Sequence, residues 1–285
     1  MSIVLDNNYY SDKTITRSFS LKNSHIGFDD VVSDSVLSGS AAAGFPVSAL
    51  NNKFTYDFYR SSSINFSIIV DAGIVKTVDY IGIAKHNLAN QRLKLSASSN
   101  GVDYVDVVEF IPTDNNALMI IFEAISARYF KLERLSYGGA SMEFNFYSQS
   151  YSTVTDAAFA QIAVLNIGRA LEMQRMIFGG HNPAKLGREA EIRPNTSEGG
   201  AFLGRSIIRQ GAQCEYSFSN LEGNWYRAYF DPFAAHALTK PFFIAWRPFG
   251  YANECQFAWT DKPIKPANTG PNNWLSVSFN VIGCD

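Results

Sequence analysis

The sequence predicts a mainly β protein with two domains, an N-terminal β-sandwich over residues 1–150 and a β-rich domain over residues 151–285 that carries one or two helices. Several segments of the first half alternate apolar and polar residues with the period of two that half-buried strands require. The pair Asn100-Gly101, between two such segments, is typical of a hairpin turn. All four tryptophans follow residue 224 and eight of the ten prolines follow residue 180. This shift in composition indicates a second domain.

The strands of the first domain are expected to be short. In Arg92–Ser98, the side chains of Leu93, Leu95 and Ala97 share one face, and Tyr104–Phe110 forms the return strand of a hairpin. Several short strands at this spacing are typical of a β-sandwich. The further strands expected in this domain are Ile64–Val70, Val75–Ala84, Tyr129–Leu135 and Met142–Phe146.

The two domains are expected to meet near residues 148–165, because Ser148–Thr155 is polar like a linker. Asp156–Phe178 fits a helix or a strand equally well: its alanines, leucines and methionines favour a helix, whereas its apolar run also suits a strand. A short helix is expected over Tyr229–Leu238, with Asp231 as its N-cap and Pro232 at its first position. The strands expected in the second domain are 205–208, 214–218, 242–246 and 275–281.

Composition and charge exclude several classes of protein. The chain is 46% hydrophobic and has a formal net charge of -2, so it is not intrinsically disordered and lacks the basic excess that binds nucleic-acid phosphates. No apolar stretch approaches the roughly 20 residues of a membrane-spanning helix, and no secretory signal is readable at the N-terminus. We therefore expect no nucleic-acid partner, no membrane span, synthesis in the cytoplasm and three free thiols.

The sequence contains no recognisable catalytic or metal-binding motif. Its four histidines, His25, His86, His181 and His236, are far apart, and no zinc motif or phosphate-binding glycine loop is present. Glu189 and Glu191 fit the exposed face of a strand better than a catalytic carboxylate pair. We therefore expect a protein that is not an enzyme and that has no metal and no cofactor.

The segment Pro241–Tyr251 is rich in aromatic residues and contains a single charged residue, an arginine. Two interpretations are open, and both can hold. The segment is a buried strand followed by a turn, or it forms a subunit interface, since interface cores are enriched in aromatic residues and arginine. The candidate interface residues are Phe242, Trp246, Arg247, Phe249 and Tyr251.

Three motifs of the first domain occur in a familiar order. Pro46–Asn52 is a proline and alanine before an Asn-rich turn, Leu93–Val107 contains a Ser-Asn-Gly hairpin turn with a following aromatic, and Ala127–Leu132 has the pattern of a closing strand. The segment from about Ala43 to Leu135 thereby resembles the discoidin domain, also called the coagulation factor 5/8 C-terminal type, of the galactose-binding-like superfamily. It lacks the bracketing cysteines of extracellular members.

This resemblance implies a jelly-roll β-sandwich that binds glycans or lipids through loops at one end. The matching loops are Ser48–Ser62 and Lys85–Gln91. The alternative is a purely structural module whose loop residues are only solvated. The candidate ligand-binding residues are Tyr59, Arg60, His86, Asn87 and Asn90.

The second half resembles tail-tip or baseplate proteins of tailed bacteriophages, above all the distal tail protein, in the motifs Gly204–Ser206, Trp225–Phe233 and Pro241–Pro248. The resemblance implies a virion structural protein, made in the host cytoplasm and located in the tail. Its partners would be other copies in a homo-oligomeric ring, the tail tube, other tail-tip proteins and host cell-surface glycans. The alternatives are a free carbohydrate-binding lectin and the accessory module of a glycan-degrading enzyme.

Overall fold

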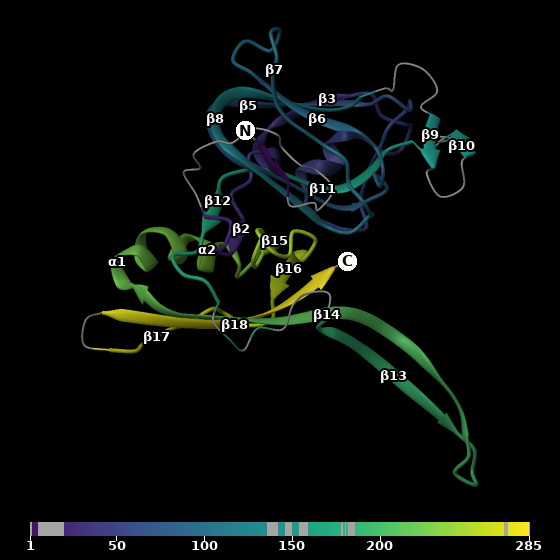
Figure 1. Cartoon of the computed structure of the whole chain (residues 1–285), viewed down its shortest axis with the longest axis vertical. Helices are drawn as coiled ribbons and strands as arrows, with labels where there is room; N and C mark the ends of the chain where they lie inside the picture. The colour runs from purple at the N-terminus through teal and green to yellow at the C-terminus, as the bar shows by residue number, and fades with distance from the viewer. Residues whose placement is uncertain are drawn as a thin grey trace. The chain divides into compact units, whose positions relative to one another are not determined.

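The computed structural model shows a mainly β protein, as the sequence predicts (Figure 1). By their contacts, the described residues divide into a sandwich unit, within 1–16, 29–116 and 120–168, and an assembly unit, within 17–28, 117–119 and 169–285. The assembly unit is therefore built from separate segments of the chain. The structure describes residues 2–4, 20–135, 142–145, 150–153, 159–177, 179, 181, 186–270 and 273–284.

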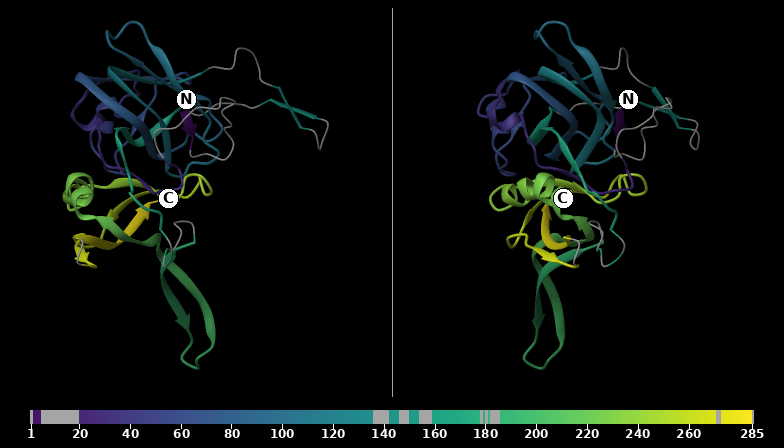
Figure 2. Two further views of the ribbon diagram at one scale, coloured as in Figure 1. Left: turned by 60° about the vertical axis from the view of Figure 1, so that its left-hand side comes forward. Right: turned by 90° about the vertical axis from the view of Figure 1, so that its left-hand side faces the viewer.

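The sandwich unit is built on one eight-stranded sheet. Its long strands β5 (Ser67–His86) and β8 (Leu118–Arg134) are neighbours in this sheet, which curls over on itself (Figures 1 and 2). Both strands contribute buried apolar side chains to the core of the unit. The strand order is β4 (Tyr59–Arg60), β11 (Gln161–Gly168), β5, β8, β6 (Leu93–Ser98) and β7 (Val105–Phe110), with β1 (Ser2–Val4) paired to β8 and β3 (Val36–Gly39) paired to β5. A separate hairpin joins β9 (Met142–Asn145) to β10 (Ser150–Thr153), and two short 3-10 helices are η1 (Val32–Asp34) and η2 (Val47–Asn51).

The predicted hairpin over residues 92–110 is confirmed, and its apolar side chains face the core. Leu93, Leu95 and Ala97 are buried, and Ala97 pairs with Val105. The loop between the two strands is longer than a two-residue turn, and side-chain oxygens accept the hydrogen bonds of its backbone amides. The Ser98 hydroxyl accepts hydrogen bonds from the amides of residues 100 and 101, and the Asn100 side chain accepts from those of residues 102 and 103.

In the described part of the ambiguous stretch, residues 159–177, the chain forms strands and no helix. β11 pairs with both β5 and β4, and its residues 162–168 are all buried. When both faces of a strand are buried, its sequence is a continuous apolar run and does not alternate between apolar and polar residues. Residues 67–70 of the strand expected at 64–70, and the whole of the strand expected at 75–84, belong to the single strand β5.

The assembly unit contains a second sheet and one helical segment. Phe230, Phe233 and Phe242 pack together in its core, and Cys214 and Cys255 are buried free thiols. The side chain of Cys284 lies outside the described residues. The strand order is β12 (Ala170–Glu172), β2 (His25–Gly27), β15 (Phe242–Ala245), β16 (Cys255–Thr260), β18 (Trp274–Cys284), β14 (Phe202–Glu222) and β13 (Arg188–Thr196), with β17 (Pro266–Asn268) paired to β18.

The helical segment of the assembly unit begins earlier than the sequence predicts. It runs through α1 (Gly223–Trp225), a π-helical turn at Tyr226–Phe230 and α2 (Asp231–His236). Asp231 itself has helical backbone angles, so the expectation that it is the N-cap is wrong. The π-helical turn widens the helix just before Pro232. In a continuous α-helix the residue at this position would donate a backbone hydrogen bond, which proline cannot do because it has no N–H group. No helix in the described part of the chain is long and apolar enough to span a membrane.

Candidate functional site

Two of the five predicted ligand-binding residues are core residues of the sandwich unit. Tyr59 is fully buried and its hydroxyl donates a hydrogen bond to the carbonyl oxygen of Ser40. His86 is buried at the end of β5, between the backbone amide of Leu88 and the carbonyl oxygen of Asn116. Both side chains thus lie in the core of the unit, and the ligand-binding role that the sequence suggested for them stays a prediction.

The contacts of His86 fix its protonation state. Nδ1 accepts a hydrogen bond from the Leu88 amide, so the ring is neutral and Nε2 donates to the Asn116 carbonyl. Burial lowers the pKa of this imidazole to about 4. The histidine therefore ties the loop after β5 to the segment before β8, and it is a structural residue of this loop.

We predict that His86 makes the sandwich unit sensitive to acid. A histidine whose pKa is depressed in the folded state binds its proton first in the unfolded chain, so stability is lost as the pH falls from 6.5 towards about 4. The loss from this one group amounts to about 3 kcal/mol. Urea unfolding at pH 7.5 and at pH 4.5, followed by far-ultraviolet circular dichroism, should show a smaller pH effect in His86→Gln than in the wild type.

Asn87 and Asn90 hold the loop that follows β5. The Asn87 side chain donates to the carbonyl oxygen of Phe159 at 2.9 Å and accepts from the amide of Gln161 at 2.7 Å. Both polar atoms of this amide are thereby used within the protein. Asn90 adopts a φ of 61°, and its amide donates to the carbonyl oxygen of Pro112. Asparagine tolerates this left-handed conformation better than most residues, and the Asn90 side chain remains exposed.

Arg60 lies beside this loop because β4 pairs with β11. Its guanidinium carbon lies 5.5 Å from the centre of the Phe159 ring, in a cation–π arrangement. The structure thus brings Arg60 and Asn87 together around Phe159, a half-exposed aromatic residue that sequence reasoning missed. A planar cation above a partly exposed ring can donate hydrogen bonds to a polar ligand.

The predicted interface residues of the assembly unit are split between core and surface. Phe242 is fully buried and belongs to the core of the unit, so its role in an interface stays a prediction. The Trp246 indole donates a hydrogen bond to the Glu254 carboxylate. It also stacks on the Tyr251 ring, with the two ring centres 5.0 Å apart. Arg247 and Phe249 lie in an exposed turn that the amides of residues 250 and 251 close on the Arg247 carbonyl.

A larger exposed surface lies elsewhere in the assembly unit, in the hairpin of β13 and β14. From Ala212 onwards β14 pairs with β18, whereas its earlier residues pair with β13 alone. Residues 190–208 are exposed on both faces, apart from Ser197 and Gly204, which are half-buried. We call residues 190–208 the projecting ribbon (Figures 1 and 2). Its exposed large apolar side chains are Ile192, Phe202, Leu203, Ile207 and Ile208.

The ribbon carries apolar residues on both of its faces. Ile192 and Ile207 are cross-strand partners and share one face. Ile208, adjacent to Ile207 in the same strand, points to the opposite face. The sequence predicted a strand at 205–208. It did not predict that Ile207 and Ile208, which are adjacent and point to opposite faces, would both be exposed to solvent. Among the described residues, no group of three or more His, Cys, Asp or Glu side chains is placed to hold a metal ion.

Comparison with known proteins identified no matching family model and no matching curated protein. Solved structures that resemble the chain include chitosan-binding module 1 from a chitosanase/glucanase of Paenibacillus sp. IK-5, at 16% identity over 48% of this chain and 97% of that one, with a TM-score of 0.38. The family 32 carbohydrate-binding module of Clostridium perfringens NanJ, solved with galactose, matches at 20% identity over 49% and 97%, with a TM-score of 0.38. The C-terminal domain of a Bacteroides fragilis chitobiase matches at 17% identity over 51% and 99%, also with a TM-score of 0.38.

Proposed function

We propose that this chain is a non-catalytic structural component of a bacteriophage tail tip or baseplate, of the distal-tail kind. In this proposal the assembly unit joins a homo-oligomeric ring next to the tail tube and other tail-tip proteins. The sandwich unit contacts glycans of the host cell surface. The observation that carries the proposal is the projecting ribbon, which leaves five large apolar side chains exposed on a two-stranded hairpin.

A two-stranded hairpin is only marginally stable in water unless another element covers it. Large exposed apolar patches on soluble proteins mark interaction sites. The ribbon sequence also mixes both signs of charge, with Arg193 and Arg205 against Glu191 and Glu198. A surface with both signs of charge can meet a different, complementary patch on another copy, and a repeated contact of this kind forms a ring when its rotation closes.

The sandwich unit supports the glycan-contact part of the proposal through Arg60, Phe159 and the loops around Asn87 and Asn90. The same unit would suit a free lectin or the accessory module of a glycan-degrading enzyme. The ribbon favours the virion component, because a freely circulating monomer would keep residues 190–208 exposed on both faces.

Sedimentation velocity of the full chain at micromolar concentration, alone and with a tail-tube protein, tests this proposal. We expect a discrete oligomer larger than a dimer, or a complex with the tube, because another subunit or the tube would bury the exposed apolar side chains of the ribbon. A chain that stays a strict monomer and also ignores the tube contradicts the tail-tip proposal. If that monomer binds immobilised glycans, the lectin alternative takes its place.

A further inference from the structure

The two ends of β14 lead to two different exposed surfaces of the assembly unit. At one end, the residues before Ala212 pair with β13 alone and lead into the projecting ribbon. At the other end, Glu222 leads directly into the helical segment that begins with α1. Between these ends, residues 212–222 pair with β18 (Figure 1). At about 3.3 Å per residue, this paired stretch separates the ribbon from the helical segment by about 30 Å.

The start of the helical segment presents an aromatic surface to solvent. Tyr229 is 58% exposed, and its ring centre lies 6.1 Å from that of Trp225. Trp225 is half-buried and packs against the core of the unit. Arg227, which lies between them in the chain, is exposed and donates a hydrogen bond to the carbonyl oxygen of Gly223 at 2.7 Å. We call Trp225, Arg227 and Tyr229 the helix patch.

Buried neighbours hold the helix patch in a fixed position. Tyr229 lies in the π-helical turn Tyr226–Phe230, and the first and last residues of this turn are buried in the core. The Arg227 guanidinium also contacts Asn273 Oδ1 at 3.5 Å, at the start of β18. A π-helical turn is rare and occurs frequently at functional sites. A surface that is already ordered loses little entropy when a partner binds.

We propose that the helix patch binds the projecting ribbon of a second copy of this chain. Tryptophan, tyrosine and arginine are the residue types that dominate the binding energy of protein interfaces. The ribbon supplies large aliphatic side chains such as Ile207, which can pack against the face of an aromatic ring. It also exposes the carboxylates of Glu191 and Glu198, which are of opposite charge to Arg227.

The pairing of β14 with β18 requires that this contact joins two copies. The ribbon of one copy cannot reach its own helix patch, because residues 212–222 hold the two surfaces apart. Each copy would therefore use its ribbon towards one neighbour and its helix patch towards another. A head-to-tail contact of this kind forms a ring when its rotation closes. The inference rests on the ring-assembly part of the proposed function and names the surface that the ribbon meets.

A mixture of two variants of the full chain tests this contact. Ile207→Asp places a charge in the ribbon, and Tyr229→Asp places one in the helix patch. We expect each variant alone to self-associate about 100-fold more weakly than the wild type, or less. Mixed in equal amounts, they should form a heterodimer and no larger species, because one variant keeps an intact ribbon and the other an intact helix patch. Sedimentation velocity at micromolar concentration measures both results.

The matched control is Tyr56→Asp, which makes the same substitution at an exposed tyrosine of the sandwich unit. It should assemble as the wild type does. Tyr229→Ala removes the ring without adding a charge, and it should also weaken assembly. Thermal unfolding, followed by far-ultraviolet circular dichroism, should be the same for Tyr229→Ala and the wild type, which separates a lost contact from a lost fold.

The outcomes separate this inference from the proposed function. If the wild type forms the oligomer and Tyr229→Asp assembles equally well, the inference is wrong while assembly through the ribbon stands. Loss of assembly in Phe249→Asp but not in Tyr229→Asp would place the contact at the exposed turn of residues 247–251 instead. A mixture that gives no heterodimer would also contradict the inference. A wild type that stays monomeric contradicts the ring and the inference together.

Discussion

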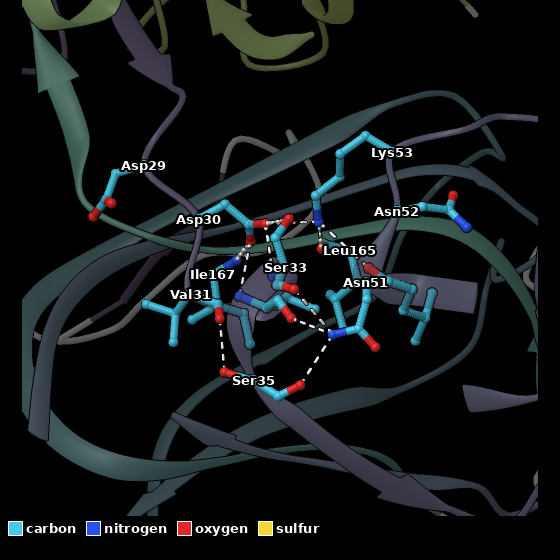
Figure 3. A network of polar contacts seen from close by, with 12 residues as sticks. Asp29, Asp30, Val31, Ser33, Ser35, Asn51, Asn52, Lys53, Leu165 and Ile167 are labelled. Carbon is cyan, nitrogen blue, oxygen red and sulfur yellow. Dashed lines mark hydrogen bonds and ion pairs between the residues drawn. The ribbon is translucent and has the colours of Figure 1, made fainter. Parts of the chain in front are cut away.

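Asp30→Ala should lower the free energy of unfolding of the sandwich unit by about 3–5 kcal/mol, the usual cost of breaking a buried ion pair. The substitution leaves the Lys53 ammonium buried without its carboxylate partner (Figure 3). It also removes the acceptor for the amides of Val32 and Ser33. Loss of this one side chain therefore affects the ion pair and the turn that carries η1.

The two units offer separate signals for this measurement. All four tryptophans follow residue 224, so tryptophan fluorescence reports on the assembly unit while far-ultraviolet circular dichroism reports on both. We expect Asp30→Ala to move the dichroism transition to lower urea concentration with little change in the fluorescence transition. Asp34→Ala is the matched control, because Asp34 is an exposed carboxylate of the same turn. If Asp30→Ala and Asp34→Ala unfold alike, the buried network does not stabilise the unit.

Ile207→Asp should abolish assembly without unfolding the chain. Ile207 is 59% exposed and pairs across the ribbon with Ile192, so the monomer tolerates a carboxylate there. In an assembly that covers the ribbon, the same carboxylate would be buried without a partner, which costs several kcal/mol. Each 1.4 kcal/mol is a factor of ten in affinity, so we expect self-association at least about 100-fold weaker. Sedimentation velocity over a concentration series measures this change.

The control for the ribbon variant is Val102→Asp, which places the same charge on an exposed valine of the sandwich unit. It should leave the association constant unchanged. Equal loss of assembly in Val102→Asp and Ile207→Asp would mean that added negative charge, not the ribbon, controls association. Normal assembly of Ile207→Asp would show that the ribbon is not part of the interface.

Segments that alternate apolar and polar residues predicted strands of the sandwich unit well, because a strand with one buried face has an apolar residue at every second position. The 92–110 hairpin is the best example. β11 was undecided between helix and strand because both of its faces are buried, which removes the period. The start of the helical segment was missed because a π-helical turn precedes Asp231 and lets the helix continue into Pro232.

The sequence could not tell which candidate site residues lie in the core and which lie at the surface. Tyr59 and His86 were chosen because their rings suit a sugar, but residue type does not reveal which side of a loop points inward. Tyr59 follows an exposed loop directly, yet it occupies the core. Alternation cannot decide this in an irregular loop, where burial depends on distant partners such as Asp30.

Amide hydrogen exchange of the assembled full chain tests the central claim most directly. In an assembly built through the projecting ribbon, the backbone amides of residues 190–208 become buried against another subunit. Their exchange should slow by about tenfold or more on going from nanomolar to micromolar concentration, while the exposed loop at residues 99–104 keeps its rate. An assembly in which residues 190–208 exchange as fast as in the dilute chain would contradict the role that we give to the ribbon.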